Sequence, residues 1–271
     1  MTGAHTTRVR VEEIMGIPMS IHVVTAGESI GPDVEEAVGA CFDELRDIDR
    51  VFSTYRDDSD ILRIRRGELT IAEADPRVAV VADACGRAET ETRGLFSATW
   101  RGWFDPTGYV KGWAVEEASR RHLAPLLSGV IAVGINAGGD LQLFTAAGSA
   151  WRWHVGIADP HDRTRVIATI DVVDGAVATS GTAERGLHIV DPRTGERATG
   201  VASATVVAPG LAQADVWATV AVVASADHAW IADAGSRTGI LVDDDGRVTR
   251  WLGSTTVEVQ TATPVSGAPA A

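Results

Sequence analysis

The stretch of sequence that decides the fold runs from residue 129 to residue 144 and reads GVIAVGINAGGDLQLF. Two apolar runs, 130–135 and 141–144, flank a polar segment that contains the pair Gly138 and Gly139. Short apolar runs separated by a glycine-containing turn are typical of a β-hairpin, so we expect two strands here. Glycines in such a turn also let the backbone approach a flat ligand closely, and the pattern alone leaves both interpretations open.

The rest of the chain extends outward from this hairpin in blocks of strands and blocks of helices. Apolar runs and alternation predict further strands at 151–157, 166–173, 176–179, 187–190, 202–207, 239–242 and 248–252, and two short strands within 8–24. Apolar spacing and capping residues predict helices at 33–52, about 59–64, 75–91, 109–124, 212–225 and 229–234. Because no regular strand–helix alternation is present, the predicted class is α+β, with a mostly antiparallel sheet flanked by helices.

Length and composition limit the function classes. The chain has 271 residues and a formal net charge of −13, which disfavours nucleic-acid binding. Two cysteines, Cys41 and Cys85, exclude a disulfide framework and a cysteine-based zinc site, so we expect buried free thiols. No apolar run is long enough to span a membrane, and the N-terminus has no leader or lipid-anchor pattern, so we expect a cytoplasmic protein.

Lys111 is the only lysine, although Lys plus Arg number 24. It follows a glycine-containing loop in the segment FDPTGYVKGWA, residues 104–114. Backbone N–H groups and an ammonium at a helix start can hold a phosphate or a polar ring edge. The alternative is an ordinary Asp-Pro turn before a helix, with one lysine left by chance in an arginine-rich chain.

Two further clusters are weak when each is taken alone. Asp215 and Thr219 are four residues apart in the predicted helix 212–225, so their oxygens lie on one face and could contribute to a Mg²⁺ shell. The alternative is a helix-start Asp and a Thr bonded back to its own helix. His188 lies on a predicted strand among apolar residues, where a lone histidine is more often structural than catalytic.

Taken in chain order, these clusters resemble the ApbE family, the FAD:protein FMN transferases. The resemblance extends from about Val11 to Leu252 and rests on Met15-Gly16, Ser53-Thr54-Tyr55 with Ser59-Asp60-Ile61, Lys111-Gly112-Trp113-Ala114-Val115, residues 136–140, Thr179-Ser180-Gly181, His188-Ile189-Val190-Asp191-Pro192, and Ala214-Asp215 with Thr219. It implies one ApbE-like domain over residues 8–253. The remainder, 254–271, is low in core residues and is expected to be a disordered tail.

The resemblance also implies the chemistry. Mg²⁺ would bind the FAD pyrophosphate, a Thr or Ser hydroxyl of an acceptor flavoprotein would attack the FMN-side phosphorus, and AMP would leave. By matching positions, Asp215, Thr219 and the carbonyl of Gly108 resemble metal ligands, and His188 resembles the general base. The positions that match the flavin site or its pocket are Met15, Tyr55, Asp105, Lys111, Ile189, Gly138, Gly139, Asp140, Thr179, Ser180 and Gly181.

The chain also departs from the family pattern. Two family elements are fused in the loop before Lys111, so Leu95, Phe96 and Ser97 correspond to the first element, and Ser97 stands where the family has Asp. Glu116 likewise stands where an Asp usually follows the Lys-Gly helix start.

Two alternatives to the transferase remain at this stage: a Mg²⁺-dependent FAD pyrophosphatase that uses water as the nucleophile, and a non-catalytic FAD-binding protein. A pure binder would not need a metal pair and a base, so Asp215, Thr219 and His188 count against the second alternative.

Overall fold

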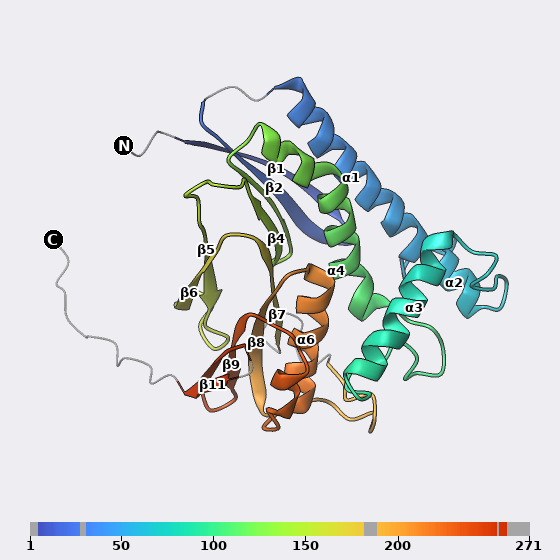
Figure 1. Cartoon of the computed structure of the whole chain (residues 1–271). Helices are drawn as coiled ribbons and strands as arrows, with labels where there is room; N and C mark the ends of the chain where they lie inside the picture. Colours follow the sequence, from blue (N-terminus) through green and yellow to red (C-terminus); the bar gives the residue numbers. More distant parts are fainter. Residues whose placement is uncertain (1–4, 28–30, 182–188, 254, 259–271) are drawn as a thin grey trace.

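A computed structural model describes residues 5–27, 31–181, 189–253 and 255–258, and its centre is one large antiparallel sheet (Figure 1). In spatial order, the sheet consists of β1 (Thr6–Ile14), β2 (Ile17–Thr25), β3 (Ala132–Ala137), β4 (Asp140–Thr145), β7 (Gly175–Gly181), β8 (Val201–Ala208), β9 (Thr238–Asp243), β10 (Val248–Leu252) and β11 (Thr255–Glu258). Every neighbouring pair is antiparallel. The α+β class with an antiparallel core is therefore confirmed.

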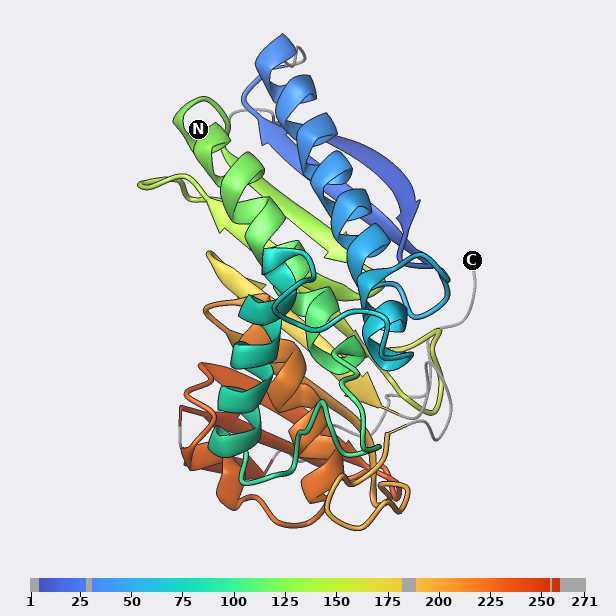
Figure 2. The ribbon, with the colours of Figure 1, turned by 90° about the vertical axis from the view of Figure 1, so that its right-hand side faces the viewer.

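The helices pack against one face of this sheet (Figures 1 and 2). They are α1 (Pro32–Phe52), α2 (Asp60–Arg65), α3 (Pro76–Glu91), α4 (Thr107–Ala118) and α6 (Leu211–Ala224). Helices α1 and α4 run side by side across the sheet, and α4 also contacts α6. α4 continues into a π-helical turn, Ser119–Leu123, and a 3₁₀ turn, Ala124–Ser128. α6 is buried over most of its length, because its apolar residues face both the sheet and α4.

A separate two-stranded sheet covers part of the opposite face (Figure 1). Its strands are β5 (Trp153–Ala158) and β6 (Val166–Val172). Trp153 and Val172 of this hairpin pack against Leu143 and Val177 of the large sheet. The site described below lies on the other face, between the large sheet and the helices, and no residue of this hairpin lines it.

Several boundaries differ from the sequence prediction. The predicted strand 187–190 is not present in its described part, because Ile189 is irregular and Val190 makes only an isolated bridge to Arg197. The predicted helix 229–234 is only a 3₁₀ turn, Ala229–Ala232. β11 lies within the range expected to be a disordered tail and pairs with β10, so that expectation is wrong for residues 255–258.

Two expectations from composition agree with the structure. Cys41 and Cys85 are free and buried. Within the described ranges, no helix combines the length and apolar character that a membrane span requires.

Candidate functional site

A cavity of about 550 Å³ opens between the large sheet and the helices. Its walls come from the β3–β4 turn, strand β7, helices α2, α4 and α6, and the segments 95–105 and 189–192. Most of the residues singled out from sequence line it: Tyr55, Leu95, Phe96, Ser97, Asp105, Gly108, Lys111, Gly138, Asp140, Thr179, Ser180, Gly181, Ile189, Asp215 and Thr219. The fold thus brings together residues that are as far apart in the sequence as Tyr55 and Thr219.

The charged centre of the cavity is Lys111, whose ammonium lies between two carboxylates. Its Nζ donates a hydrogen bond to Oδ2 of Asp140 and lies 2.9 Å from Oδ2 of Asp215. Asp140 and Asp215 are both buried, at 6% and 8% exposure. Buried carboxylates are costly unless they are paired, so this single lysine compensates two charges that the fold has removed from water.

Burial and the charges of the neighbouring residues determine the pKa values of Asp140 and Lys111. Burial and the neighbouring charge of Asp215 raise the pKa of Asp140 to about 6, against the opposing effect of Lys111. Burial disfavours the charged form of Lys111, but the two carboxylates outweigh it and raise the pKa of the ammonium. The two carboxylates therefore favour the ammonium form of Lys111 in this site.

A glycine permits the close helix contact that places Lys111 beside Asp215. A Cβ on Gly112 would lie 3.0 Å from the carbonyl oxygen of Leu211 and 3.2 Å from Cβ of Asp215. Only a residue without a side chain lets α4 and α6 approach this closely without a shift. Lys111 and Asp215 belong to these two helices, so their contact depends on this approach.

The β3–β4 turn places Asp140 on the other side of the lysine. Gly138 and Gly139 have φ angles of 64° and 105°, and the N–H of Gly139 donates to Oδ1 of Asn136 at 2.8 Å. Gly138 also donates to the carbonyl of Pro18 at 3.1 Å, which ties this turn to the β1–β2 hairpin. The hairpin interpretation of the Gly-Gly pair is confirmed, and Gly138 of this turn also lines the cavity.

Hydroxyl groups border the carboxylates on the sheet side. The Oγ atoms of Ser180 and Thr219 are 3.1 Å apart, and the hydroxyls of Thr179 and Thr205 are 2.8 Å apart. The N–H of Thr179 donates to Oδ1 of Asp140 at 2.9 Å. Thr219 thus faces β7 and the cavity, and it does not serve only to bond back to its own helix.

Asp105 has a local structural contact in addition to its place in the cavity wall. Its Oδ1 accepts hydrogen bonds from the N–H of Thr107, at 3.2 Å, and from the hydroxyl of Thr107. The carboxylate therefore fixes the start of α4, where Gly108 lines the cavity. The two sequence interpretations, an Asp-Pro turn and a site residue, are compatible here.

Two of the predicted site residues that the structure describes do not line the cavity. Met15 is in the turn between β1 and β2, and Gly139 is in the β3–β4 turn, but neither lines the cavity. His188 lies outside the described residues. Glu116, the departure noted beside Lys111, accepts a hydrogen bond from the N–H of Ala212 at 3.0 Å and so caps α6.

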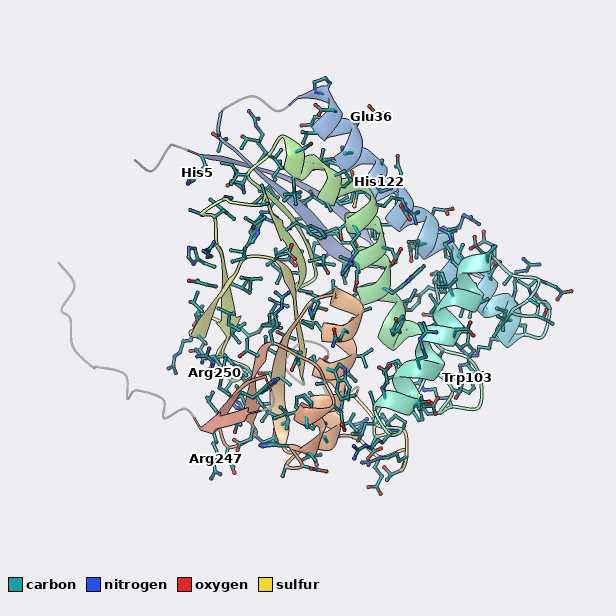
Figure 3. All side chains as sticks on the ribbon, in the orientation of Figure 1. His5, Glu36, Trp103, His122, Arg247 and Arg250 are labelled. Atoms are coloured by element: carbon teal, nitrogen blue, oxygen red, sulfur yellow. The ribbon has the colours of Figure 1, made fainter. Side chains whose placement is uncertain are left out.

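An aromatic and cationic wall was missed by the sequence prediction. The guanidinium of Arg65 lies 4.4 Å from the ring centre of Trp103, and that of Arg101 lies 4.7 Å from the ring centre of Trp100; all four residues line the cavity. Trp103 belongs to the loop between α3 and α4 (Figure 3). The aromatic residues concentrated in 100–104 were a sequence signal for this wall. No sequence signal pointed to Arg65, because it reaches the cavity only through tertiary packing.

The oxygen atoms around Asp215 bear on the magnesium site that the resemblance implies. Within the described ranges, no three His, Cys, Asp or Glu side chains form a metal cluster. The available donors are the carboxylate of Asp215, the hydroxyl of Thr219 and backbone carbonyls, all of them oxygen ligands that suit Mg²⁺. Lys111 contacts Oδ2 of Asp215. The other carboxylate oxygen of Asp215, Oδ1, accepts no hydrogen bond from any described residue. These residues therefore fit a Mg²⁺ ion that completes its shell with waters and phosphate oxygens.

Comparison with solved structures shows the same fold. The ApbE protein of Thermotoga maritima superimposes with a TM-score of 0.75 at 21% identity, covering 90% of this chain and 97% of that chain. The flavin transferase ApbE of Vibrio cholerae gives a TM-score of 0.70 at 19% identity, covering 93% of this chain and 98% of that chain.

Sequence comparison points to the same group of proteins. An FAD:protein FMN transferase of Rhodobacter capsulatus is 33% identical over 156 residues, which are 53% of this chain and 29% of that protein. One of Escherichia coli (strain K12) is 31% identical over 110 residues, which are 36% of this chain and 31% of that protein. The matched part thus spans less than a third of these two relatives. The sequence model of the ApbE family matches residues 15–105 and 101–239, most of the chain, and on that coverage the chain belongs to the ApbE family.

Proposed function

We propose that this protein is a Mg²⁺-dependent FAD:protein FMN transferase. It binds FAD in the cavity and moves FMN to a Thr or Ser hydroxyl of an acceptor flavoprotein. The acceptor oxygen forms a bond to the FMN-side phosphorus, the bond from that phosphorus to the bridging oxygen breaks, and AMP leaves with the bridging oxygen. The proton of the hydroxyl passes to a general base.

The observation that carries this proposal is the grouping around Lys111. In a chain of net charge −13, the cavity contains a half-buried ammonium beside a carboxylate, a hydroxyl and the start of α4. Phosphoryl transfer asks the protein for positioning and charge neutralisation more than for covalent chemistry, and this grouping is suited to both tasks.

We assign the metal contacts to Asp215, Thr219 and the carbonyl of Gly108. When bound, Mg²⁺ would neutralise the pyrophosphate charge and make the FMN-side phosphorus more electrophilic. Lys111 is placed to donate a hydrogen bond to bound FAD from the same end of the cavity. His188 is assigned as the base that takes the proton of the acceptor hydroxyl.

We assign the flavin and the walls around it to the rest of the cavity. The proposed contacts are Met15, Tyr55, Leu95, Phe96, Ser97, Asp105, Gly138, Gly139, Asp140, Thr179, Ser180, Gly181 and Ile189. Tyr55 is 94% exposed, so its ring is free to cover a ligand at the mouth of the cavity. A flat, mostly apolar ring against aromatic and glycine-rich walls is a common arrangement of cofactor sites.

Analysis of nucleotide products tests this proposal. The protein is incubated with FAD and Mg²⁺, with and without a candidate flavoprotein that contains a Ser or Thr acceptor, and the nucleotides are separated by chromatography. A transferase releases AMP only when the acceptor is present and releases no equivalent amount of free FMN. Equal amounts of FMN and AMP without an acceptor would identify a pyrophosphatase instead, and unchanged FAD in both reactions would contradict any catalytic role.

A further inference from the structure

The ammonium of Lys111 has two carboxylate partners, although only one of them belongs to the assigned metal ligands. Asp215 is such a ligand, and its Oδ2 lies 2.9 Å from Nζ. Asp140 accepts the other hydrogen bond and is not assigned to the metal. A divalent cation on Asp215 would lie close to the ammonium, and like charges at short distance repel strongly in a buried site.

The two carboxylates differ in how they are held. Asp140 is the first residue of β4, next to the tied β3–β4 turn, and its Oδ1 accepts the N–H of Thr179 at 2.9 Å. Lys111 reaches both carboxylates on a flexible four-carbon stem. If a divalent cation on Asp215 displaces the ammonium of Lys111, Asp140 is a fixed carboxylate to which the ammonium can still donate a hydrogen bond.

We propose that Lys111 takes the place of the metal on Asp215 in the metal-free protein, and that Asp140 is the positioning residue that retains the ammonium once a divalent cation occupies Asp215. This inference rests on the proposed function, because it takes Asp215 as the metal ligand. It gives Asp140 a role that acts through Lys111, in addition to its place in the cavity wall.

If the proposal holds, replacing Lys111 and replacing Asp140 change the affinity for the metal in opposite directions. Lys111→Met removes the competitor and is expected to bind the metal more tightly. Asp140→Asn keeps the side-chain shape and an oxygen for the N–H of Thr179, but leaves Asp215 as the only carboxylate partner of the ammonium, so it is expected to bind the metal more weakly. One charge-assisted hydrogen bond corresponds to about ten- to hundredfold in affinity for each change.

The double variant separates this role from a general effect of charge. A carboxylate attracts a cation through space whether or not a lysine lies between them. If Asp140 acts through Lys111, most of the effect of Asp140→Asn disappears in the Lys111→Met background. If it acts only through space, the effect persists in full.

Metal binding without nucleotide is the test, with Mn²⁺ as the probe because it takes the same oxygen ligands and free Mn²⁺ is measured directly by electron paramagnetic resonance. Dissociation constants are compared for the wild type, Lys111→Met, Asp140→Asn and the double variant, after circular dichroism shows that each is folded. Tighter binding by Lys111→Met, weaker binding by Asp140→Asn and a double variant close to Lys111→Met support the proposal. A wild type that binds no Mn²⁺ while Lys111→Met does also supports it, because the ammonium then blocks the site completely.

The contrary outcomes are equally defined. Lys111→Met that binds no tighter than the wild type, or an Asp140→Asn effect that is undiminished in the double variant, overturns the proposal. Asp215→Ala serves as the reference: if it binds Mn²⁺ like the wild type, the metal assignment itself is wrong. A wild type that transfers FMN while the Mn²⁺ series fails would overturn this inference and leave the proposed function standing.

Discussion

Lys111 supplies the positive charge at the centre of the candidate site. It is the only lysine of the chain, and the structure places its ammonium between two buried carboxylates. The sequence shows that Lys111 is the single lysine, but it does not show which carboxylates the ammonium contacts. Asp140 and Asp215 are far from Lys111 in the sequence, and only the tertiary fold brings them to it.

Replacement of Lys111 is expected to weaken FAD binding. Lys111→Ala removes a charge-assisted hydrogen bond to the ligand, for an expected loss of about ten- to hundredfold in affinity. Lys111→Arg is the sharper variant, because a planar guanidinium does not fit a site built around a compact ammonium, so it is also expected to bind poorly. FAD fluorescence quenching measures both, and wild-type affinity in the Arg variant would show that the lysine has no specific contact with FAD.

His188 is predicted to act on the rate and not on binding. His188→Ala is expected to lower FMN transfer by about 10²- to 10⁴-fold, the range of general base catalysis. FAD affinity, measured in the same way as for Lys111, is expected to remain that of the wild type. A variant that no longer binds FAD would mean that His188 is a ligand contact, and its assignment as the base would be wrong.

At the scale of elements, the contact between α4 and α6 determines the geometry of the site. Gly112→Ala adds a Cβ that meets backbone at 3.0 Å, so it is expected to separate the helices and lower the free energy of unfolding by about 1–3 kcal/mol. FAD affinity should fall as well, because Lys111 and Asp215 move apart. Urea unfolding followed by tryptophan fluorescence measures the stability.

Gly86→Ala in α3 is the matched control for that prediction. A Cβ on Gly86 meets nothing within 4 Å, so the same change in an open helix position is expected to stabilise the protein by about 1 kcal/mol. Equal effects of Gly112→Ala and Gly86→Ala would contradict the close-contact explanation.

The start of α3 gives a stability prediction that is independent of the site. Asp75 caps this helix by accepting the N–H of Arg77 at 2.9 Å, and its carboxylate also pairs with the guanidinium of Arg77. The hydrogen bonds from that guanidinium hold the pKa of Asp75 below its usual range. Asp75→Ala is expected to lower the free energy of unfolding by about 1 kcal/mol at neutral pH.

The pH dependence of this effect follows from the direction of the pKa shift. A carboxyl with a lowered folded-state pKa stabilises the fold above its unfolded value of about 3.9, and this contribution is lost as the pH falls through the folded-state value. The difference between wild type and Asp75→Ala should therefore be full at pH 7 and shrink below about pH 4. Asp83→Ala, an exposed carboxylate on the same helix, is the control and should show little effect at either pH.

Secondary structure was predictable wherever the pattern was local. The helix of 33–52 and the capped helix after Asp75 were predicted almost to the residue, because periodicity and caps lie within the elements themselves. The separate β5–β6 sheet and the edge strand β11 were not predicted. Alternation along a single strand does not say which strand it pairs with, and here β5 pairs only with β6 while β11 extends the large sheet beside β10.

At the scale of the whole molecule, the site is assembled from segments that span most of the chain. Most residues of the motifs that carry the resemblance line the cavity, but these motifs contained no signal for Arg65, which comes from the end of α2. The cationic wall of Arg65 and Arg101 is notable in a chain of net charge −13. We expect this wall to favour an anionic ligand at a site where the overall charge of the protein would repel one.

The central claim is that FMN is transferred covalently at the site formed by Lys111, Asp215 and Thr219. Its most direct test is the intact mass of an acceptor flavoprotein after incubation with the protein, FAD and Mg²⁺. With the wild type, we expect a mass increase of one FMN phosphoester. We expect no increase with Asp215→Ala, with EDTA, or with an acceptor whose Thr or Ser is replaced by Ala. An increase of the same size with Asp215→Ala or in EDTA would contradict it.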